Sequence, residues 1–314
     1  MGSRLYNSVV VVFWMATMSW LLIDKVWPTL RVGEPPNYSS ILKHDEADPP
    51  VCWAIHWNDR PTGWAASRIV RRSDGMSEMH SRVFIAQLPI DQLAPGWLGA
   101  IINPVLRRPG RLDMDAQSKL DIDPLGRLTG FDSSVRLANI ADALRMQGVI
   151  DGNRLKVTAQ SADFTWKTEK YISPEALVGD ALSPQARLPK LHVGQRWTMP
   201  VYSPFRPPNS PMEVLEATVE RQEPIVWNGE SVNALVVVYR SDAGISLVGE
   251  PRGKLWVRGD GLVLRQEVAM FNSHLEFTRL GAQSARELTR ELDPYQSSPI
   301  PRGVNVRLMR IVRN

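Results

Sequence analysis

The chain has 314 residues, of which 43% are hydrophobic and 22% charged, so its apolar content is that of a folded protein and bulk disorder is excluded. Its 37 basic and 33 acidic residues give a net charge of +4, and no block of five or six like charges marks a nucleic-acid-binding surface. The single cysteine excludes an intrachain disulfide and any metal site built from several cysteines.

The first segment is apolar. Residues 8–23 read SVVVVFWMATMSWLLI, without a charge, a proline or a glycine. A membrane-spanning helix needs about 20 apolar residues, with a lower limit of about 17, and flanking aromatic residues can extend a short run. Because no small-residue cleavage site follows, we expect residues 1–27 to form an uncleaved, single-pass transmembrane anchor, with the bulk of the chain outside the cytosol. A cleaved signal peptide and a buried core segment are the alternatives.

Three further regions follow the anchor. Residues 28–50 contain five prolines and an acidic cluster, which predicts an extended spacer. Residues 51–282 alternate between polar and apolar side chains, with turn residues between the runs, which is typical of a β-rich domain. Residues 283–314 predict a tail with one helix and a basic last strand.

Within these regions the elements can be predicted in chain order. Strands are expected over 52–57, 63–71, 76–88, 119–123, 127–135, 146–150, 154–159, 164–172, 197–202, 214–220, 232–239, 254–258, 262–271, 274–280 and, in the tail, 299–314. Turns are expected at 58–63 and 73–75, helices at 90–106, 177–182 and 284–292, and either a strand or a short helix at 135–145.

The short connections indicate the fold class. We count about ten to thirteen of these candidates as strands, mostly joined by turns of about two to five residues, which is typical of an antiparallel sheet rather than of βαβ units. We therefore expect a mainly β protein with a large curved antiparallel sheet, a half-barrel or open barrel. One or two short helices are expected across its concave face, in addition to the N-terminal transmembrane helix.

The histidines and carboxylates do not form a catalytic or metal-binding motif. His56, His80 and Glu78 come closest to a metal site, but ordinary strand histidines are the favoured interpretation because three or four ligands cannot be assembled. Cys52 and His56 would lie about 13 Å apart along a strand, too far for a nucleophile and its base. Cys52 is therefore expected to be a small buried residue.

Two aspartate pairs are also weighed as cation sites. Asp113 with Asp115, and Asp121 with Asp123, each lie on one strand face, but both lack the rest of a calcium loop. Solvated aspartates beside turns are the favoured interpretation. We accordingly expect no catalytic residue, no metal and no cofactor.

The tryptophans are the remaining candidates for a binding site. The chain has eleven of them, and an aromatic-lined groove can bind a lipid or a glycan. The candidates for lining such a groove are Trp53, Trp57, Trp64, Trp197 and Trp256. Packing of large side chains between a broad sheet and its cover is the alternative interpretation.

Three segments carry a resemblance to a known class of proteins. They are WAIHWNDRPTGWAASRIVRR at 53–72, VGQRWTMPVYSP at 193–204 and RGKLWVRGDGLVLRQEVAMF at 252–271. Together they resemble exported bacterial proteins of unknown function, although Asp59 and Arg60 stand where that pattern has a glycine turn. The resemblance implies a curved antiparallel sheet similar to the half-barrels of periplasmic lipoprotein carriers, and it supplies no catalytic residues. With the anchor, it places the protein at the inner membrane, facing the periplasm.

These observations favour a non-catalytic, membrane-anchored envelope protein that binds a lipid, a lipoprotein or another apolar ligand in a groove of its sheet. No nucleic-acid partner is expected. One alternative is an interaction module that contacts an envelope protein through the proline-rich residues 203–211 and the basic tail. A hydrolase of envelope polymers is the other alternative, and it would need His56 or His80 beside two carboxylates.

Overall fold

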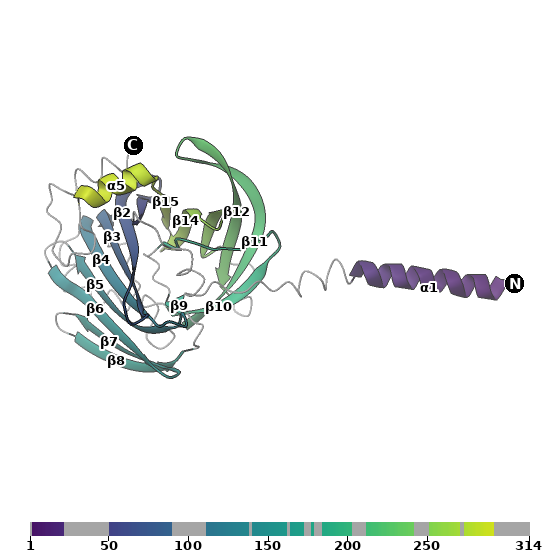
Figure 1. The fold of residues 1–314 in the computed structure, drawn as a ribbon, viewed down its shortest axis with the longest axis horizontal. Helices are drawn as coiled ribbons and strands as arrows, with labels where there is room; N and C mark the ends of the chain where they lie inside the picture. The colour runs from purple at the N-terminus through teal and green to yellow at the C-terminus, as the bar shows by residue number, and fades with distance from the viewer. Residues whose placement is uncertain are drawn as a thin grey trace.

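The computed structural model describes most of the chain. The described residues are 2–21, 50–89, 111–137, 140–161, 164–172, 177–178, 184–202, 212–241, 251–270 and 273–291. Within them the chain forms one sheet of fifteen strands, which Figure 1 shows curled into an open barrel.

The strands follow one another along the chain with few interruptions. The elements are α1 (Gly2–Leu21), β1 (Val51–Trp57), β2 (Arg60–Arg71), β3 (Ser77–Pro89), β4 (Arg111–Ile122), β5 (Leu128–Leu137), β6 (Ile140–Asp151), β7 (Arg154–Ser161), β8 (Phe164–Tyr171), β9 (Leu177–Val178), β10 (Arg196–Tyr202), β11 (Met212–Trp227), β12 (Glu230–Ser241), β13 (Gly253–Arg258), β14 (Val263–Met270), β15 (Ser273–Arg279) and α5 (Ala282–Glu291). The expected mainly β fold with a large antiparallel sheet is confirmed.

The sheet is built from two meanders that meet at its centre. Its strand order is β8-β7-β6-β5-β4-β3-β2-β1-β15-β14-β13-β12-β11-β10-β9, so β1 and β15 are neighbours although they lie far apart in the sequence. Their register places Trp53 opposite Arg279. Only β9 and β10 pair in parallel among the described strands. Because β8 and β9 end the order, the sheet is open.

Tight hairpins explain how so many strands follow one another. Asn58 and Asp59 both have positive φ, 46° and 63°, and Asn228 and Gly229 repeat this with 51° and 79°. Two consecutive residues with positive φ form the turn that matches the twist of neighbouring strands. The predicted turn over 58–63 was therefore too long, because the chain reverses within two residues and β2 begins at Arg60.

Two ambiguous segments are strands rather than helices. Of the segment 135–145, residues 135–137 form the end of β5 and residues 140–145 the start of β6, and Val135 pairs with Leu144 and Leu137 with Ile140. The helical turn expected at 177–182 was wrong at its start, because Leu177 and Val178 pair with β10. In both segments, hydrogen bonding to a neighbouring strand decides the backbone conformation, and the spacing of apolar residues along the chain does not. The helix expected at 90–106, the loop at 203–211, the last strand at 299–314 and the spacer up to residue 49 lie outside the described residues.

Alternation along the strands divides the sheet into two faces. One face carries a cluster of apolar side chains that extends from β1 to β6 on one side and to β10 on the other. We call it the inner face, because the opposite face packs against α5, which Figure 1 shows outside the curve of the sheet. The opposite, outer face is covered by α5, whose Ala285 and Leu288 pack against Cys52 and Trp64. We expected one or two helices across the concave face. Helix α5 does not lie there, because the side chains on which it packs belong to the outer face.

The N-terminal segment is helical where it is described. Helix α1 spans Gly2–Leu21, so it contains most of the predicted apolar run. Neither of the helices in the described part of the chain meets the length and hydropathy that a membrane crossing requires. The described residues therefore do not support the predicted transmembrane helix.

Candidate functional site

The inner face is the largest apolar surface of the sheet. Its members come from distant strands but lie on one side because every second residue of a strand points the same way. They include Trp53 and Ile55 on β1, Trp197 on β10, Val237 on β12 and Phe277 on β15, all below 4% exposure. A second cluster of the same kind, on β4 to β8, continues this apolar surface toward the β8 edge.

The five candidate tryptophans divide between the two faces. Trp53, Trp57 and Trp197 belong to the inner face, with exposures of 0%, 7% and 3%. Trp64 lies on the outer face, where it stacks on Phe84 at 6.3 Å between ring centroids. Trp256, on β13, also lies on the outer face, where it packs with residues of β12. Trp64 and Trp256 cannot line an inner groove. Each follows or precedes an inner-face residue in its strand, and consecutive residues of a strand point to opposite faces of the sheet.

A segment without regular structure crosses the inner face. We call residues 184–195 the crossing segment. Its Leu188 belongs to the inner cluster, and the Leu188 amide donates a hydrogen bond to the carbonyl of Gly261 at 2.7 Å. At its other end the amide of Gly194 donates to the carbonyl of Val219 on β11, at 2.8 Å. The segment therefore connects the β13–β14 turn to β11 and fills part of the space inside the sheet.

Polar groups gather where the crossing segment meets the sheet. The amide of Gln185 donates to the Oε1 atom of Gln266 on β14 at 2.9 Å, and Tyr239 on β12 donates to Oε1 of Gln185 at 3.5 Å. Arg279 donates from Nη1 to the carbonyl of Ala186 at 3.0 Å. Burial raises the pKa of Tyr239, so its phenol stays neutral and remains a donor.

Three N–H groups at this junction lack an acceptor among the described residues. They are Nε1 of Trp53, Nε1 of Trp197 and Nε of Arg187, all buried. The guanidinium of Arg279 lies 5.6 Å from the centroid of the Trp53 ring, and the ring of Trp197 meets that of Tyr239 edge-on at 6.3 Å. Other buried N–H groups are unpaired in the same way, among them Nε1 of Trp64 on the outer face, so the unpaired state does not by itself distinguish this region.

Sequence reasoning missed Arg187, Gln185 and Arg279 at this junction. For Arg279 a signal was present, because it follows Leu275 and Phe277 at intervals of two residues and so shares their face. The crossing segment offered no such signal, since its residues have no strand periodicity and its position depends on contacts with β11 and β14.

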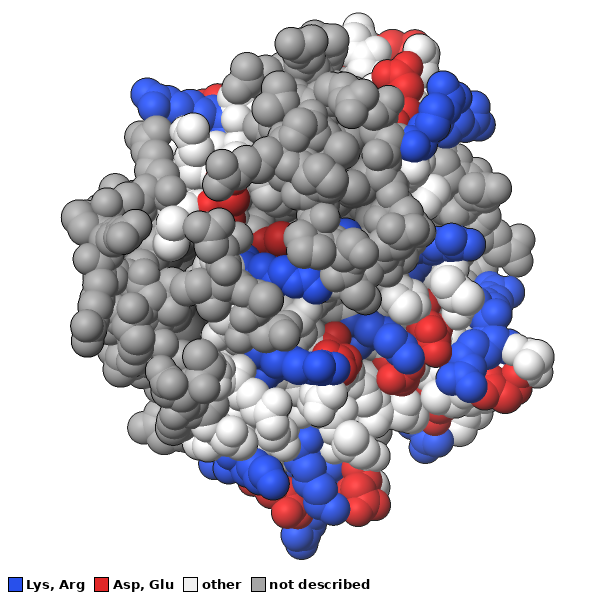
Figure 2. All heavy atoms as spheres, turned by 90° about the vertical axis from the view of Figure 1, so that its left-hand side faces the viewer, with Lys and Arg blue, Asp and Glu red and all other residues white. Residues whose placement is uncertain are grey.

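The outer face carries charged side chains in pairs of opposite sign. Figure 2 shows basic and acidic residues side by side on the left-hand side of the molecule as drawn in Figure 1. Arg82, which is 1% exposed, donates to both carboxylate oxygens of Asp115, at 2.9 and 2.6 Å. More exposed pairs lie on the neighbouring strands, such as Arg145 with Asp132 at 2.9 Å and Arg154 with Glu169 at 2.9 Å.

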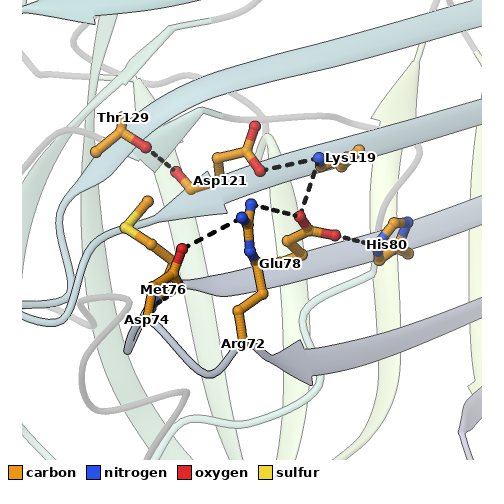
Figure 3. Close-up of polar contacts among 8 residues, drawn as sticks. All are labelled: Arg72, Asp74, Met76, Glu78, His80, Lys119, Asp121 and Thr129. Atoms are coloured by element: carbon orange, nitrogen blue, oxygen red, sulfur yellow. Dashed lines mark hydrogen bonds and ion pairs between the residues drawn. The ribbon is translucent and has the colours of Figure 1, made fainter.

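His80 and Glu78, which were weighed for a metal site, are part of this charged face. Figure 3 shows the Glu78 carboxylate between Arg72, Lys119 and His80, at 3.3, 3.1 and 3.1 Å. Although burial raises the pKa of Glu78, the hydrogen bonds from Lys119 and His80 outweigh burial and leave this pKa below its usual value. Burial lowers the pKa of Lys119, and its hydrogen bonds to Glu78 and Asp121 outweigh that effect and raise it. Both groups therefore keep fixed charges near neutral pH, which is unfavourable for proton transfer.

The other candidate pairs are not assembled either. His56 stands opposite Glu276 and Pro61, whereas His80 stands opposite Arg68 and Lys119, so the sheet does not bring the two histidines together. In each aspartate pair, at least one carboxylate is bound to an arginine or a backbone amide. Among the described residues, no group of three or more histidine, cysteine, aspartate or glutamate side chains could hold a metal ion.

Cys52 is buried on the outer face, as predicted. It is 1% exposed and packs beneath α5, where its Sγ atom lies 4.0 Å from the carbonyl oxygen of Ala285. Burial raises the pKa of the Cys52 thiol to about 12. The thiolate is the nucleophilic form, so this environment suppresses cysteine chemistry.

Comparison with known proteins finds a likeness among solved structures. No protein-family model matches the chain, and no curated protein matches it. Among solved structures the chain is similar to a β-barrel-like protein of the domain of unknown function DUF1849 from Brucella abortus, with 10% sequence identity and a TM-score of 0.45. The match covers 74% of this chain and 94% of that chain.

Proposed function

We propose that this protein is a non-catalytic carrier that holds an apolar molecule against the inner face of its sheet. The width of the sheet is the observation that carries the proposal. A closed barrel of about eight strands is filled by its own inward side chains, whereas barrels of about 16 strands enclose an aqueous channel. Fifteen curved strands therefore surround more space than their inward side chains fill, and the surface facing that space is apolar.

The chain itself supplies part of the filling. Ala186, Leu188 and Leu191 of the crossing segment pack on the inner face. The inner side chains are already buried, so an apolar ligand would replace part of their cover, and it would keep the same apolar surface away from water. The open order of the sheet, which ends at β8 and β9, offers a route of entry that does not require a closed barrel to break.

The absence of catalysis is part of the proposal. It is supported by the fixed charges around Glu78 and by the protonated thiol of Cys52, since neither group is poised to transfer a proton or attack a substrate near neutral pH.

Attachment to a membrane through residues 1–27 is a further part of the proposal. Large apolar side chains of α1 are exposed, including Phe13 at 72%, Trp14 at 60% and Trp20 at 69%. Exposed apolar residues gathered on one element mark an interaction site. We expect the full chain to stay with the membrane pellet during alkaline carbonate extraction, and Phe13→Lys with Trp14→Lys to release it. The matched control is Val226→Lys, at a residue of β11 that is 78% exposed, and this variant should stay with the membrane pellet.

Ligand binding can be tested with the purified chain. We expect native mass spectrometry to detect a bound apolar species, solvent extraction to release it, and the emptied protein to take up the fluorescent probe N-phenyl-1-naphthylamine. Ala217→Phe, at a buried inner-face residue, should weaken the affinity for the probe about tenfold or more. Ala234→Phe, at an equally buried residue of the outer face, is the control for general overpacking. A purified protein with no bound species and no uptake of the probe would contradict the proposal.

A further inference from the structure

Strand β8 forms one open edge of the sheet. It stands first in the strand order, and among the described strands it pairs only with β7. Figure 1 shows it at one end of the curled sheet. The pairing with β7 runs from Phe164 to Tyr171 without a register shift, so alternate residues of β8 direct their amides and carbonyls away from β7. Such a row of backbone groups is a template for another strand.

Several features that usually protect an edge strand are missing from β8. Its 8 residues make it longer than an average strand, and they include neither a proline nor a bulge. Because Trp166 packs on the inner cluster, the odd-numbered residues of β8 lie on the outer face. Lys167 and Glu169 are exposed there, and Tyr171 is 70% exposed. An edge lysine opposes pairing with many strands, so the charges decide which strand fits.

The charges of β8 complement those of a second copy of β8. When two copies pair antiparallel with Thr168 opposite itself, Lys167 of each copy stands opposite Glu169 of the other. The same register places Lys170 opposite Trp166 on the inner side, where an ammonium group can lie over the indole. A shift of two residues in either direction would place lysine opposite lysine or glutamate opposite glutamate. One register therefore pairs residues 165–171 in full and also matches the charges.

Lys167 is available for this contact. Two neighbouring basic side chains of the outer face have carboxylate partners: Arg154 contacts Glu169 at 2.9 Å, and Lys156 contacts Asp151 at 3.0 Å. Lys167, in contrast, forms no hydrogen bond or ion pair with the described residues. Glu169 uses its Oε1 atom for Arg154, and an ionised carboxylate has lone pairs for a second cation.

We propose that two copies of this chain form a symmetric dimer by pairing their β8 strands antiparallel, with Thr168 on the twofold axis. The contact uses the same residues from both copies, as a closed twofold dimer requires. It covers the exposed Tyr171 with Thr165 of the other copy. The inference does not depend on the carrier function, and in the dimer the β9 edge remains for entry of a ligand.

Disulfide cross-linking tests the register. In the proposed dimer the two Cα atoms of residue 168 lie about 4.5–5.5 Å apart, which is within the range of a disulfide. We expect Thr168→Cys in the full chain to form a disulfide-linked dimer on mild oxidation. Thr165→Cys is the matched control, because the two copies of residue 165 would lie about 20 Å apart. The native Cys52 is 1% exposed and does not interfere.

A charge swap tests the recognition. We expect sedimentation equilibrium of the full chain in dodecyl maltoside micelles to show a dimer. Lys167→Glu should raise its dissociation constant about tenfold or more, because two carboxylates then face each other at both ends of the contact. Adding Glu169→Lys to that variant should restore the dimer, since each pair again has opposite charges. Arg286→Glu makes the same change in net charge at an exposed position of α5 and should leave the dimer unchanged.

Three results would overturn the inference. The first is a chain that stays monomeric and forms no disulfide through residue 168. The second is cross-linking that is as efficient through residue 165 as through residue 168, because random collisions would explain both. The third is a dimer that tolerates Lys167→Glu and forms no disulfide through residue 168, because another surface would then join the copies. All three leave the carrier function as it stands.

Discussion

The buried pair of Arg82 and Asp115 gives a sharp test of the charge pattern on the outer face. Asp115→Ala removes the carboxylate that receives two hydrogen bonds from Arg82, and it leaves a guanidinium that is only 1% exposed. Removing one partner of a buried ion pair costs about 3–5 kcal/mol, because the remaining charge cannot be solvated. Since the Asp115 side chain is itself 12% exposed, water can reach the vacated position and the lower end of that range applies.

Urea unfolding of the purified protein measures this loss. With a slope of about 3 kcal/mol per molar urea, a loss of about 3 kcal/mol lowers the midpoint by about 1 M. Asp132→Ala is the matched control on the same face, because its partner Arg145 is 48% exposed and such pairs contribute about 1 kcal/mol or less. The control should therefore lose about 0.3 M or less.

The double variant Arg82→Leu with Asp115→Leu completes this test. Replacing a buried ion pair with apolar residues is often neutral, so the double variant should recover most of the stability that Asp115→Ala loses. If Asp115→Ala lost no more stability than Asp132→Ala, the reasoning about burial of this pair would be refuted.

Three other predictions concern different parts of the protein. Because the pKa of Cys52 is about 12, its thiol should resist Ellman's reagent at about pH 8, and Leu288→Ala, by loosening α5, should increase the labelling rate. The hydrogen bond from Trp256 lowers the pKa of Glu223 in the folded protein. The stability that this carboxylate contributes is therefore present above about pH 4.3, the pKa of an unperturbed glutamate, and is lost as the pH falls through the lower folded pKa. Glu223→Gln should make the free energy of unfolding depend less on pH in this acidic range. Gly148→Ala should lower the unfolding midpoint, because the new Cβ would stand 2.1 Å from the Phe131 ring.

Each of these predictions has its own control. Arg286→Ala changes the exposed side of α5 and should leave the labelling of the thiol unchanged. Glu230→Gln, at an exposed position in the β11–β12 hairpin, should keep the acid limb of the stability curve. Gly259→Ala adds a Cβ that meets nothing within 4 Å, so a loss equal to that of Gly148→Ala would contradict the steric explanation.

The sequence by itself determined the β class and most hairpins. Period-two alternation and turn pairs such as Asn228-Gly229 are local signals, and both the strands and the turns they predict are present. The helix near residue 284 was also predictable, because its apolar residues recur at helical spacing. Local patterns succeed here because hydrogen bonding between consecutive strands is itself local.

The tertiary structure alone decided which surfaces face one another. Trp53 and Trp64 are both fully buried tryptophans in neighbouring strands, yet one lies on the inner face and the other beneath α5. The pairing of β1 with β15 joins Trp53 to Arg279, and the crossing segment joins Leu188 to Gly261; no local pattern encodes contacts between residues so far apart in the sequence. The contact of Arg279 with the Trp53 ring exists only because β1 pairs with β15, since that pairing places the two residues opposite each other.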